Sequence, residues 1–449
     1  MEASNFLKEN NARHIWHPMG HPGKLQKDAP TIIVGGDGVH VSDIDGHRVV
    51  DGVGGLWNVN LGYSCDPVKQ AIAAQLERLP YYSAFAGTSN DAAIRLSYEL
   101  MEWFAEEGMA RAFFTSGGSD SVETALRLAR QYHKLRGETG RTKFLSLKKG
   151  YHGTHFGGAS VNGNNRFRLA YEPLLDGCVH LPAPYPYRDP NGFEDPERLA
   201  QSILAAAEDA IAFEGANRIA AFIMEPVLGA GGVHVPHASL MPGMREICER
   251  HGILMIADEV ITGFGRTGDW SGSRHWSVAP DIMCLAKAIT NGYFPFGATL
   301  LSGSVAEVFE KAGGDGFIGH GYTYSAHPVG AAGALACLAE TKRLQVKDNA
   351  AARGTQIYEG LLELQTRHEL IGDVRGGHGL MTAIELVSDR SAKAAVSPEI
   401  ALKVQKLAYE NGAMLRASGP TIIISPPLII SKWDADVIIG AIDKALSSV

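Results

Sequence analysis

The stretch LMIADEVITGFGRTG, residues 254–268, decides the fold of this chain. It begins within a short apolar run, Ile253–Ala257, that leads to Asp258, and a second run of the same kind, Ile282–Ala286, leads to Lys287. Runs this short and this uniformly apolar are typical of strands buried on both faces of a parallel sheet. Because ligands bind at the carboxyl ends of such strands, we expect Asp258 and Lys287 to face one crevice.

The same alternation of short apolar runs and helical patterns extends outward from about residue 111 to residue 303. It predicts an α/β fold, in which a mostly parallel central sheet is flanked by helices. The strand candidates are Ala112–Thr115, Lys143–Leu147, Ile219–Met224, Ile253–Ala257, Ile282–Ala286 and Gly297–Leu301.

Both ends of the chain have a different pattern. Residues 31–53 predict a hairpin with Gly-Gly-Asp-Gly and Asp-Gly turns. The region after Pro328 predicts long helices, a strand at Gly379–Leu386, a helix near Ile400–Asn411 and a strand pair within Met414–Ser425. We therefore predict a smaller α+β domain built from both termini. The predicted division is 1–62 and 329–449 for the small domain and 63–328 for the large domain.

Composition excludes several classes of function. The chain has 449 residues, with 41 Lys plus Arg against 49 Asp plus Glu, so its net charge is 41 − 49 = −8. This acidic balance argues against a nucleic-acid partner. Five scattered cysteines without a CxxC pair indicate a reduced cytoplasmic protein, and the sequence shows neither a signal peptide nor an apolar run that predicts a membrane span.

Ionisable residues follow three of the predicted strands, where Glu225 joins Asp258 and Lys287. A glycine-rich turn, Gly117-Gly118-Ser119, stands between a strand and a helix and can hold an anion with its backbone N–H groups. Tyr151 stands at the end of another strand segment and can stack on a planar ring. Taken singly, each feature has a structural alternative: a helix cap, a buried ion pair or core packing.

Together these features match the needs of pyridoxal phosphate. A lysine forms a Schiff base with its aldehyde, a carboxylate keeps its ring nitrogen protonated, an aromatic stacks on the ring and an anion cradle holds the phosphate. A metal centre is the weaker hypothesis, because His14, His17 and His21 are interrupted by Pro18 and Gly20. We expect no metal ligands.

The chain resembles the class III pyridoxal-phosphate-dependent aminotransferases of fold type I over nearly its whole length. Their PLP-transferase fold has the large and small domains described above. The motifs that carry the resemblance are residues 254–268, residues 285–298 (LAKAITNGYFPFGA), residues 225–232 (EPVLGAGG) and residues 320–328 (HGYTYSAHP).

The resemblance implies a role for each site residue. Lys287 would be the Schiff-base lysine and Asp258 the partner of the pyridinium nitrogen, while Val260 and Tyr151 would pack on opposite faces of the ring. The other implied cofactor contacts are Gly118, Ser119, Glu225 and Thr323. Thr323 would reach the phosphate of the neighbouring subunit, which implies a homodimer or higher homo-oligomer with the active site at the interface.

The resemblance also implies the substrates. The segment 55–63, GLWNVNLGY, is similar to the subgroup that moves amino groups from ω-amino acids and simple amines to pyruvate by a ping-pong mechanism. Donor candidates are β-alanine, taurine, diamines and aryl-alkyl amines. Arg416 would clamp the substrate carboxylate, although an isolated arginine can also be a surface residue. The residues expected in an aromatic substrate pocket, if they are not core residues, are Trp57, Tyr82, Phe85 and Tyr151.

Two alternatives stay open at this point. One keeps the cofactor and changes the reaction to that of a decarboxylating transaminase, an aminomutase or a racemase. The other is a non-catalytic binding protein that retains the fold, which an intact Lys287 with Asp258 disfavours. A nicotinamide enzyme is disfavoured because the glycines after the predicted strands do not form the dinucleotide-binding fingerprint.

Overall fold

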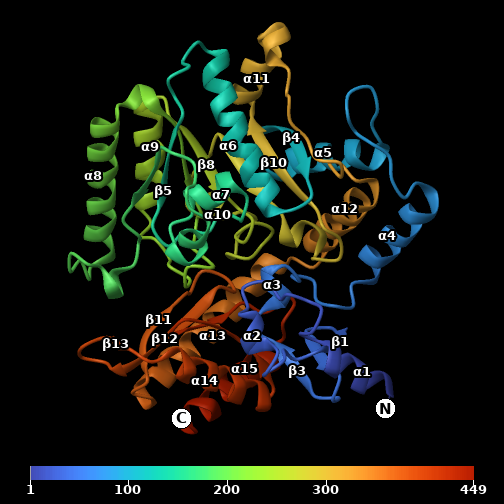
Figure 1. The fold of residues 1–449 in the computed structure, drawn as a ribbon, viewed down its shortest axis with the longest axis vertical. Helices are drawn as coiled ribbons and strands as arrows, with labels where there is room; N and C mark the ends of the chain where they lie inside the picture. Colours follow the sequence, from blue (N-terminus) through green and yellow to red (C-terminus); the bar gives the residue numbers. More distant parts are fainter. Residues whose placement is uncertain (1) are drawn as a thin grey trace.

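The computed structural model describes residues 2–449. Figure 1 shows a central sheet between helices in the upper part of the molecule. The blue N-terminal and red C-terminal segments lie together in the lower part, and both ends of the chain are found there.

The central sheet has seven strands in the order β4-β10-β9-β8-β7-β5-β6. The strands from β9 to β6 are parallel to their neighbours, and β10 is antiparallel to both β9 and β4. This confirms the predicted α/β fold with a mostly parallel sheet. The strands are β4 (Met109–Thr115), β5 (Lys143–Leu147), β6 (Cys178–Leu181), β7 (Ile219–Met224), β8 (Leu254–Asp258), β9 (Ile282–Leu285) and β10 (Gly297–Ser302).

Strand β6 is the member of this sheet that the sequence did not predict. It has four residues, lies at the edge of the sheet, and only Leu181 at its end is buried. An edge strand that is partly exposed lacks the uniformly apolar run by which a central strand is recognised. The sequence Cys-Val-His-Leu therefore carries no clear strand signal.

Helices cover both faces of the central sheet, because neighbouring residues of a strand point to opposite sides. In β8, Ile256 packs with the helices of one face and Met255 with those of the other. One face is covered by α6 (Gly118–Leu135), α7 (Phe156–Val161) and α11 (Gly303–Lys311). The other is covered by α5 (Asp91–Trp103), α8 (Pro196–Glu214), α9 (Leu240–His251) and α12 (Pro328–Arg343).

Two smaller sheets form the lower part of the molecule. The first has the order β1-β2-β3-β14, in which β14 from the C-terminal region pairs in parallel with β3 from the N-terminal region. The second has the order β11-β12-β16-β15, with β13 beside β12. Their bounds are β1 (Ile33–Asp37), β2 (His40–Asp43), β3 (Arg48–Asp51), β11 (Ile371–Arg375), β12 (Thr382–Asp389), β13 (Ala394–Ala395), β14 (Ala413–Met414), β15 (Arg416–Ser418) and β16 (Thr421–Ile424).

The remaining helices pack around these sheets. Those of the C-terminal region share a core with β11, β12 and β16. The exact domain division at residues 62 and 328 stays a prediction. The helices are α1 (Glu2–Asn10), α2 (Pro22–Leu25), α3 (Gly54–Trp57), α4 (Asp66–Arg78), α10 (Gly272–His275), α13 (Val346–Arg367), α14 (Pro398–Glu410) and α15 (Lys432–Ser447). Within residues 2–449, none of the helices combines the length and the apolar character that crossing a bilayer requires.

Candidate active site

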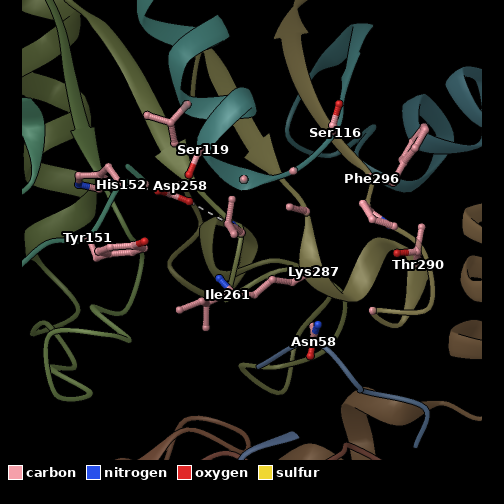
Figure 2. Close-up of a pocket in the computed structure, with 18 of the residues that line it drawn as sticks. Asn58, Ser116, Ser119, Tyr151, His152, Asp258, Ile261, Lys287, Thr290 and Phe296 are labelled. Carbon is pink, nitrogen blue, oxygen red and sulfur yellow. Dashed lines mark hydrogen bonds and ion pairs between the residues drawn. The ribbon is translucent and has the colours of Figure 1, made fainter. Parts of the chain in front are cut away.

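A pocket of about 370 Å³ opens at the carboxyl edge of the central sheet. Asp258 ends β8, Lys287 follows β9 after one residue, and Glu225 follows β7 directly. All three line the pocket, and Figure 2 shows the side chains of Asp258 and Lys287 converging on it. The edge that the sequence predicted as a ligand site is therefore where these residues meet.

Lys287 begins a short 3₁₀ turn, η5 (Lys287–Thr290), with a left-handed backbone at φ 51°. Such a conformation is costly for a residue with a side chain and persists where the surrounding structure holds it in place. Its Nζ atom has no hydrogen-bond partner among residues 2–449. Burial lowers the pKa of Lys287, although Asp258 and Glu225 oppose this shift. The low pKa favours the neutral amine, which is the reactive form of lysine.

Asp258 is held in place by two contacts. Its Oδ2 atom accepts a hydrogen bond at 2.8 Å from Nδ1 of His152, and its Oδ1 atom accepts one at 3.2 Å from the backbone N–H of Val260. Asp258 and His152 are both buried. Sequence reasoning missed His152, although it stands beside Tyr151, because nothing in the sequence pairs a histidine in this loop with a carboxylate 106 residues away.

The glycine-rich turn forms the N-terminus of α6, where backbone N–H groups are free to hold an anion. A Cβ atom on Gly118 would lie 2.9 Å from Cγ1 of Val260, so glycine lets the turn pack closely against Val260. The Oγ atom of Ser119 accepts a hydrogen bond at 3.2 Å from the N–H of Thr154. Gly118 and Ser119 both line the pocket, and their contact with a phosphate stays a prediction.

Asp120 completes this turn from the inside. One of its oxygens accepts a hydrogen bond at 3.0 Å from the N–H of Ser116, and the other pairs with Nε2 of His155 at 2.6 Å. The carboxylate is therefore occupied by the protein itself. Asp120 therefore stabilises the turn formed by Gly117, Gly118 and Ser119, and the backbone N–H groups of that turn stay available to a ligand.

Glu225 is buried at the floor of the pocket. Its carboxylate accepts hydrogen bonds at 2.9 Å from the N–H groups of Tyr151 and Gly229. Burial is the main cause that raises the pKa of Glu225 to about 7. The bond to Tyr151 fixes the backbone beneath that ring, which lines the pocket together with Val260.

These residues fit pyridoxal phosphate. Tyr151 and Val260 line the pocket and offer an aromatic and an apolar surface to a flat ring, and the N-terminus of α6 offers backbone N–H groups to a phosphate. At the same pocket, Asp258 offers a buried carboxylate to a ring nitrogen and Lys287 offers an unpaired amine to an aldehyde. Among residues 2–449, no group of three or more metal-ligating side chains was found.

Glu259, next to Asp258 in sequence, points away from the pocket and supports its wall. Its buried carboxylate accepts hydrogen bonds from the N–H of Gly272 at 2.9 Å, from the N–H and Oγ of Ser273 at 2.6 Å each, and from Thr262. Every partner is a donor, so an ionised carboxylate satisfies the whole cluster.

The change Glu259→Gln is expected to destabilise the fold by about 3 kcal/mol, because an amide N–H₂ would face donors in a buried site. Thermal and urea unfolding of the purified protein measure this loss. The change Glu363→Gln, at an exposed position of α13, serves as the control and should leave both midpoints unchanged. Equal stability of the two variants would contradict the structural role of Glu259.

Five further predicted site residues lie outside the lining of this pocket. Thr323 is exposed, and its carbonyl accepts a hydrogen bond at 2.8 Å from Tyr81. Tyr82 and Phe85 are 54% and 52% exposed, whereas Trp57 is 1% exposed and packs in the core with residues of β5, β7 and β8. Their substrate or cofactor roles stay predictions.

Arg416, the fifth of these residues, begins β15 and is partly buried. Its guanidinium has no carboxylate within salt-bridge distance in the described part of the chain. Burial lowers the pKa of Arg416, the nearby charge of Arg166 lowers it further, and Tyr151 opposes the shift. The positive charge of Arg416 also contributes to the lowered pKa of Lys287. Arg416 therefore presents an unneutralised positive charge close to the pocket.

Comparisons with known proteins agree with this site. The family model described as "Aminotransferase class-III" matches residues 24–446. Putrescine–pyruvate aminotransferase of Pseudomonas aeruginosa is 34% identical over 96% of this chain and 94% of the relative. Taurine–pyruvate aminotransferase of Bilophila wadsworthia is 32% identical over 97% of this chain and 96% of the relative.

A solved structure gives the same result at the level of the fold. The amine transaminase from an uncultivated Pseudomonas species, in its PLP-bound (internal aldimine) form, superposes with a TM-score of 0.95. It is 47% identical, and the match covers 97% of this chain and 98% of the other. This chain accordingly belongs to the class III aminotransferases and is a transaminase that depends on pyridoxal phosphate.

Proposed function

We propose that this enzyme moves an amino group from a primary amine or ω-amino acid to pyruvate in two half-reactions. The relatives named for putrescine–pyruvate and taurine–pyruvate transfer support pyruvate as the acceptor. The structural relative named an amine transaminase supports a donor whose amine is not next to a carboxylate. The observation that carries the proposal is the unpaired Lys287 amine, which shares one pocket with buried Asp258.

In this proposal, Lys287 holds the cofactor through a covalent Schiff-base link, and Asp258 pairs with the ring nitrogen. Bound pyridoxal phosphate supplies a ring that accepts electrons from the donor carbon. Lys287, once released, carries a proton from the donor carbon, which requires the neutral amine that burial favours. His152 holds Asp258 in orientation, and Gly118 and Ser119 hold the phosphate.

We also propose that the working enzyme is a homodimer or a larger homo-oligomer. Thr323, Tyr82 and Phe85 are exposed in the single chain. Exposed aromatic side chains of this kind are typical of protein interfaces. A partner subunit would use Thr323 at the phosphate and the aromatic residues at the substrate pocket. Light scattering tests this, with an expected mass of at least twice that of one chain.

The change Arg416→Gln is expected to raise the Michaelis constant for pyruvate by about 10-fold to 100-fold, the range of a lost charge-assisted bond to a carboxylate. Amine donors that lack a carboxylate should react with the variant at nearly the original rate, since they do not need the guanidinium. Steady-state and half-reaction kinetics separate these effects. An unchanged constant for pyruvate would remove Arg416 from the acceptor site.

A panel of amine donors with pyruvate tests the proposed reaction as a whole. The expected result is one alanine formed for each donor amine consumed, with parallel lines in double-reciprocal plots, as a ping-pong mechanism requires. A racemase or aminomutase would convert its substrate without any keto acid, and a decarboxylating enzyme would release carbon dioxide. Turnover without a keto acid would overturn the proposed transfer to pyruvate, and release of carbon dioxide would overturn the proposed proton removal from the donor carbon. Both outcomes would leave the cofactor assignment intact.

A further inference from the structure

The turn that carries Lys287 has a left-handed residue at each of its ends. Lys287 has φ 51°, and Asn291, which follows η5 directly, has φ 53°. Within the turn, the N–H of Gly292 donates to the carbonyl of Lys287 at 3.2 Å and the N–H of Asn291 donates to that of Ala288 at 3.0 Å. These bonds close the turn but do not join it to the rest of the protein. Because a left-handed residue with a side chain persists only where its surroundings hold it, contacts outside the turn must supply that restraint.

The side chain of Asn291 joins the turn to segment 58–62. Its Oδ1 atom accepts a hydrogen bond at 2.7 Å from the N–H of Leu61, and its Nδ2 atom donates one at 2.8 Å to the carbonyl of Gly62. The hydroxyl of Tyr293 donates a second bond, at 2.7 Å, to the same carbonyl. Asn291 is fully buried. Loss of its amide would therefore leave the N–H of Leu61 without a partner in a place that is shielded from water.

Segment 58–62 is fixed on its other side to the chain that follows Asp258. The Oδ1 atom of Asn60 accepts a hydrogen bond at 2.6 Å from Nη2 of Arg266, and its Nδ2 atom donates one at 3.3 Å to the carbonyl of Phe264. Phe264 and Arg266 lie in the segment after β8, which ends at Asp258. Segment 58–62 therefore connects the chain after Asp258 with the turn of Lys287.

The same segment borders the cofactor pocket. Asn58 lines the pocket, and Figure 2 shows it below Lys287. A Cβ atom on Gly292 would lie 2.6 Å from Nδ2 of Asn58, so the turn and the segment are in close contact at this point. A shift of the turn relative to the segment would thus change the pocket itself.

On the basis of the proposed role of Lys287, we infer that Asn291 is a positioning residue that holds the Lys287 amine in its place in the pocket. Asn291 does not line the pocket and acts through the turn. Without its amide, the turn loses both bonds from this side chain to segment 58–62, and the amine is no longer held against the donor carbon. A misplacement of about 1 Å reduces the rate of a positioned reaction by about 100-fold.

Two variants loosen the joint to different extents. Asn291→Gly removes the amide and keeps the backbone, because glycine adopts a left-handed conformation without strain. Tyr293→Phe is the milder change, which removes the hydroxyl bonded to the carbonyl of Gly62 and to the N–H of Cys65. It tests the same joint if Asn291→Gly does not fold.

Two further variants are matched controls. Gln345→Gly makes the same backbone change at an exposed left-handed residue with φ 47°. Asn349→Ala removes a partly buried amide whose Nδ2 atom donates to the carbonyls of Leu428 at 2.6 Å and Ile430 at 2.9 Å. Neither residue lines the cofactor pocket. Asn349→Ala therefore reports what a loss of buried hydrogen bonds does by itself.

Two measurements on the cofactor-free protein do not depend on turnover. In Asn291→Gly, hydrogen exchange of the peptide that contains Leu61 should be about 10-fold faster than in the wild type. The rate at which added pyridoxal phosphate gains the absorbance of the covalently linked form should fall about 10-fold or more in Asn291→Gly and about threefold in Tyr293→Phe. Both controls should match the wild type in both measurements.

The half-reaction of the holoenzymes with the best donor of the panel separates positioning from binding. In Asn291→Gly we expect kcat to fall about 10-fold to 100-fold while KM for the donor stays within about threefold, since Asn291 does not line the pocket. Gln345→Gly and Asn349→Ala should stay within about twofold of the wild type in both constants.

Three results would overturn the inference. They are unchanged attachment and kcat in Asn291→Gly, a rise in KM that accounts for the whole loss, and an equal loss in Asn349→Ala. If Asn291→Gly does not fold, an unchanged attachment rate in Tyr293→Phe has the same force. Failure of the proposed function looks different, because then no donor would bleach the wild-type enzyme. In that case the attachment rate alone decides whether Asn291 positions Lys287.

Discussion

The change Lys287→Ala is expected to reduce transamination by at least about 10⁴-fold, the upper range for a positioned proton-transfer group. In the proposed mechanism the variant loses two functions at once, since the same amine would link the cofactor covalently and carry the proton. The other residues of the proposed site are unchanged: Gly118 and Ser119 would still hold the phosphate, and Asp258 would still pair with the ring nitrogen. The cofactor should therefore bind without the absorbance of a covalently linked enzyme. Stopped-flow kinetics and absorbance spectra measure both effects.

A variant of an exposed lysine serves as the control for the loss of a positive charge in general. Lys148 is exposed and does not line the cofactor pocket, so Lys148→Ala should retain wild-type kinetics and absorbance. Turnover by Lys287→Ala above about one hundredth of the wild-type rate would contradict both roles of Lys287, because a general base alone contributes at least that factor.

The second large effect is expected for Asp258→Asn. Asparagine keeps the shape of aspartate. Its Oδ1 atom can still accept the hydrogen bond from Val260, and its N–H₂ group can donate to Nδ1 of His152 when the imidazole proton is on Nε2. It carries no charge, however, to stabilise a protonated ring nitrogen. The loss of a preorganised charge at the reacting group costs on the order of 100-fold to 1000-fold in kcat. Single-turnover kinetics with saturating donor measure the chemical step directly.

Stability measurements separate this effect from unfolding. Asp258→Asn should unfold at nearly the wild-type temperature, whereas Glu259→Gln should lose stability, because only Glu259 is enclosed by donors on every side. A half-reaction rate within tenfold of the wild type in Asp258→Asn would contradict the role of this carboxylate.

The sequence predicted the central strands because burial on both faces makes them uniformly apolar. The sequence could then place Asp258 and Lys287 near each other, because neighbouring parallel strands have their carboxyl ends at the same edge of the sheet. The strand pattern by itself does not separate the roles of Asp258 and Glu259, and it was the family resemblance that selected Asp258. The two acids are adjacent, and it is the alternation of side chains at the end of β8 that turns one toward the pocket and the other into the wall.

Contacts between loops that are distant along the chain leave no recognisable pattern in the sequence. His152 meets Asp258 across 106 residues, and Phe167 packs on Tyr151. Neither His152 nor Phe167 belongs to a periodic pattern or a spaced pair that sequence reasoning can detect. In the proposed oligomer, the positions of Tyr82, Phe85 and Thr323 relative to a substrate depend on a partner chain, so one chain leaves those predictions untested.

The chain contains 52 glycines among 449 residues, and the structure shows why two of these positions need glycine. At Gly118, a Cβ atom would lie 2.9 Å from Cγ1 of Val260. Gly379 adopts φ +60°, and a Cβ atom there would lie 2.1 Å from the carbonyl oxygen of Arg266. That close approach joins the loop before β12 to the segment that follows β8, so this glycine serves packing between the two parts of the fold.

The half-reaction with donor alone tests the central claim most directly. Purified holoenzyme is mixed with excess ω-amino acid and no keto acid, and the carbonyl product is counted against active sites. The account predicts loss of the visible cofactor absorbance, one carbonyl product per site and then no further turnover. Added pyruvate should restore the absorbance and yield one alanine per site. Continued turnover without a keto acid, or no bleaching with any donor in the panel, would contradict it.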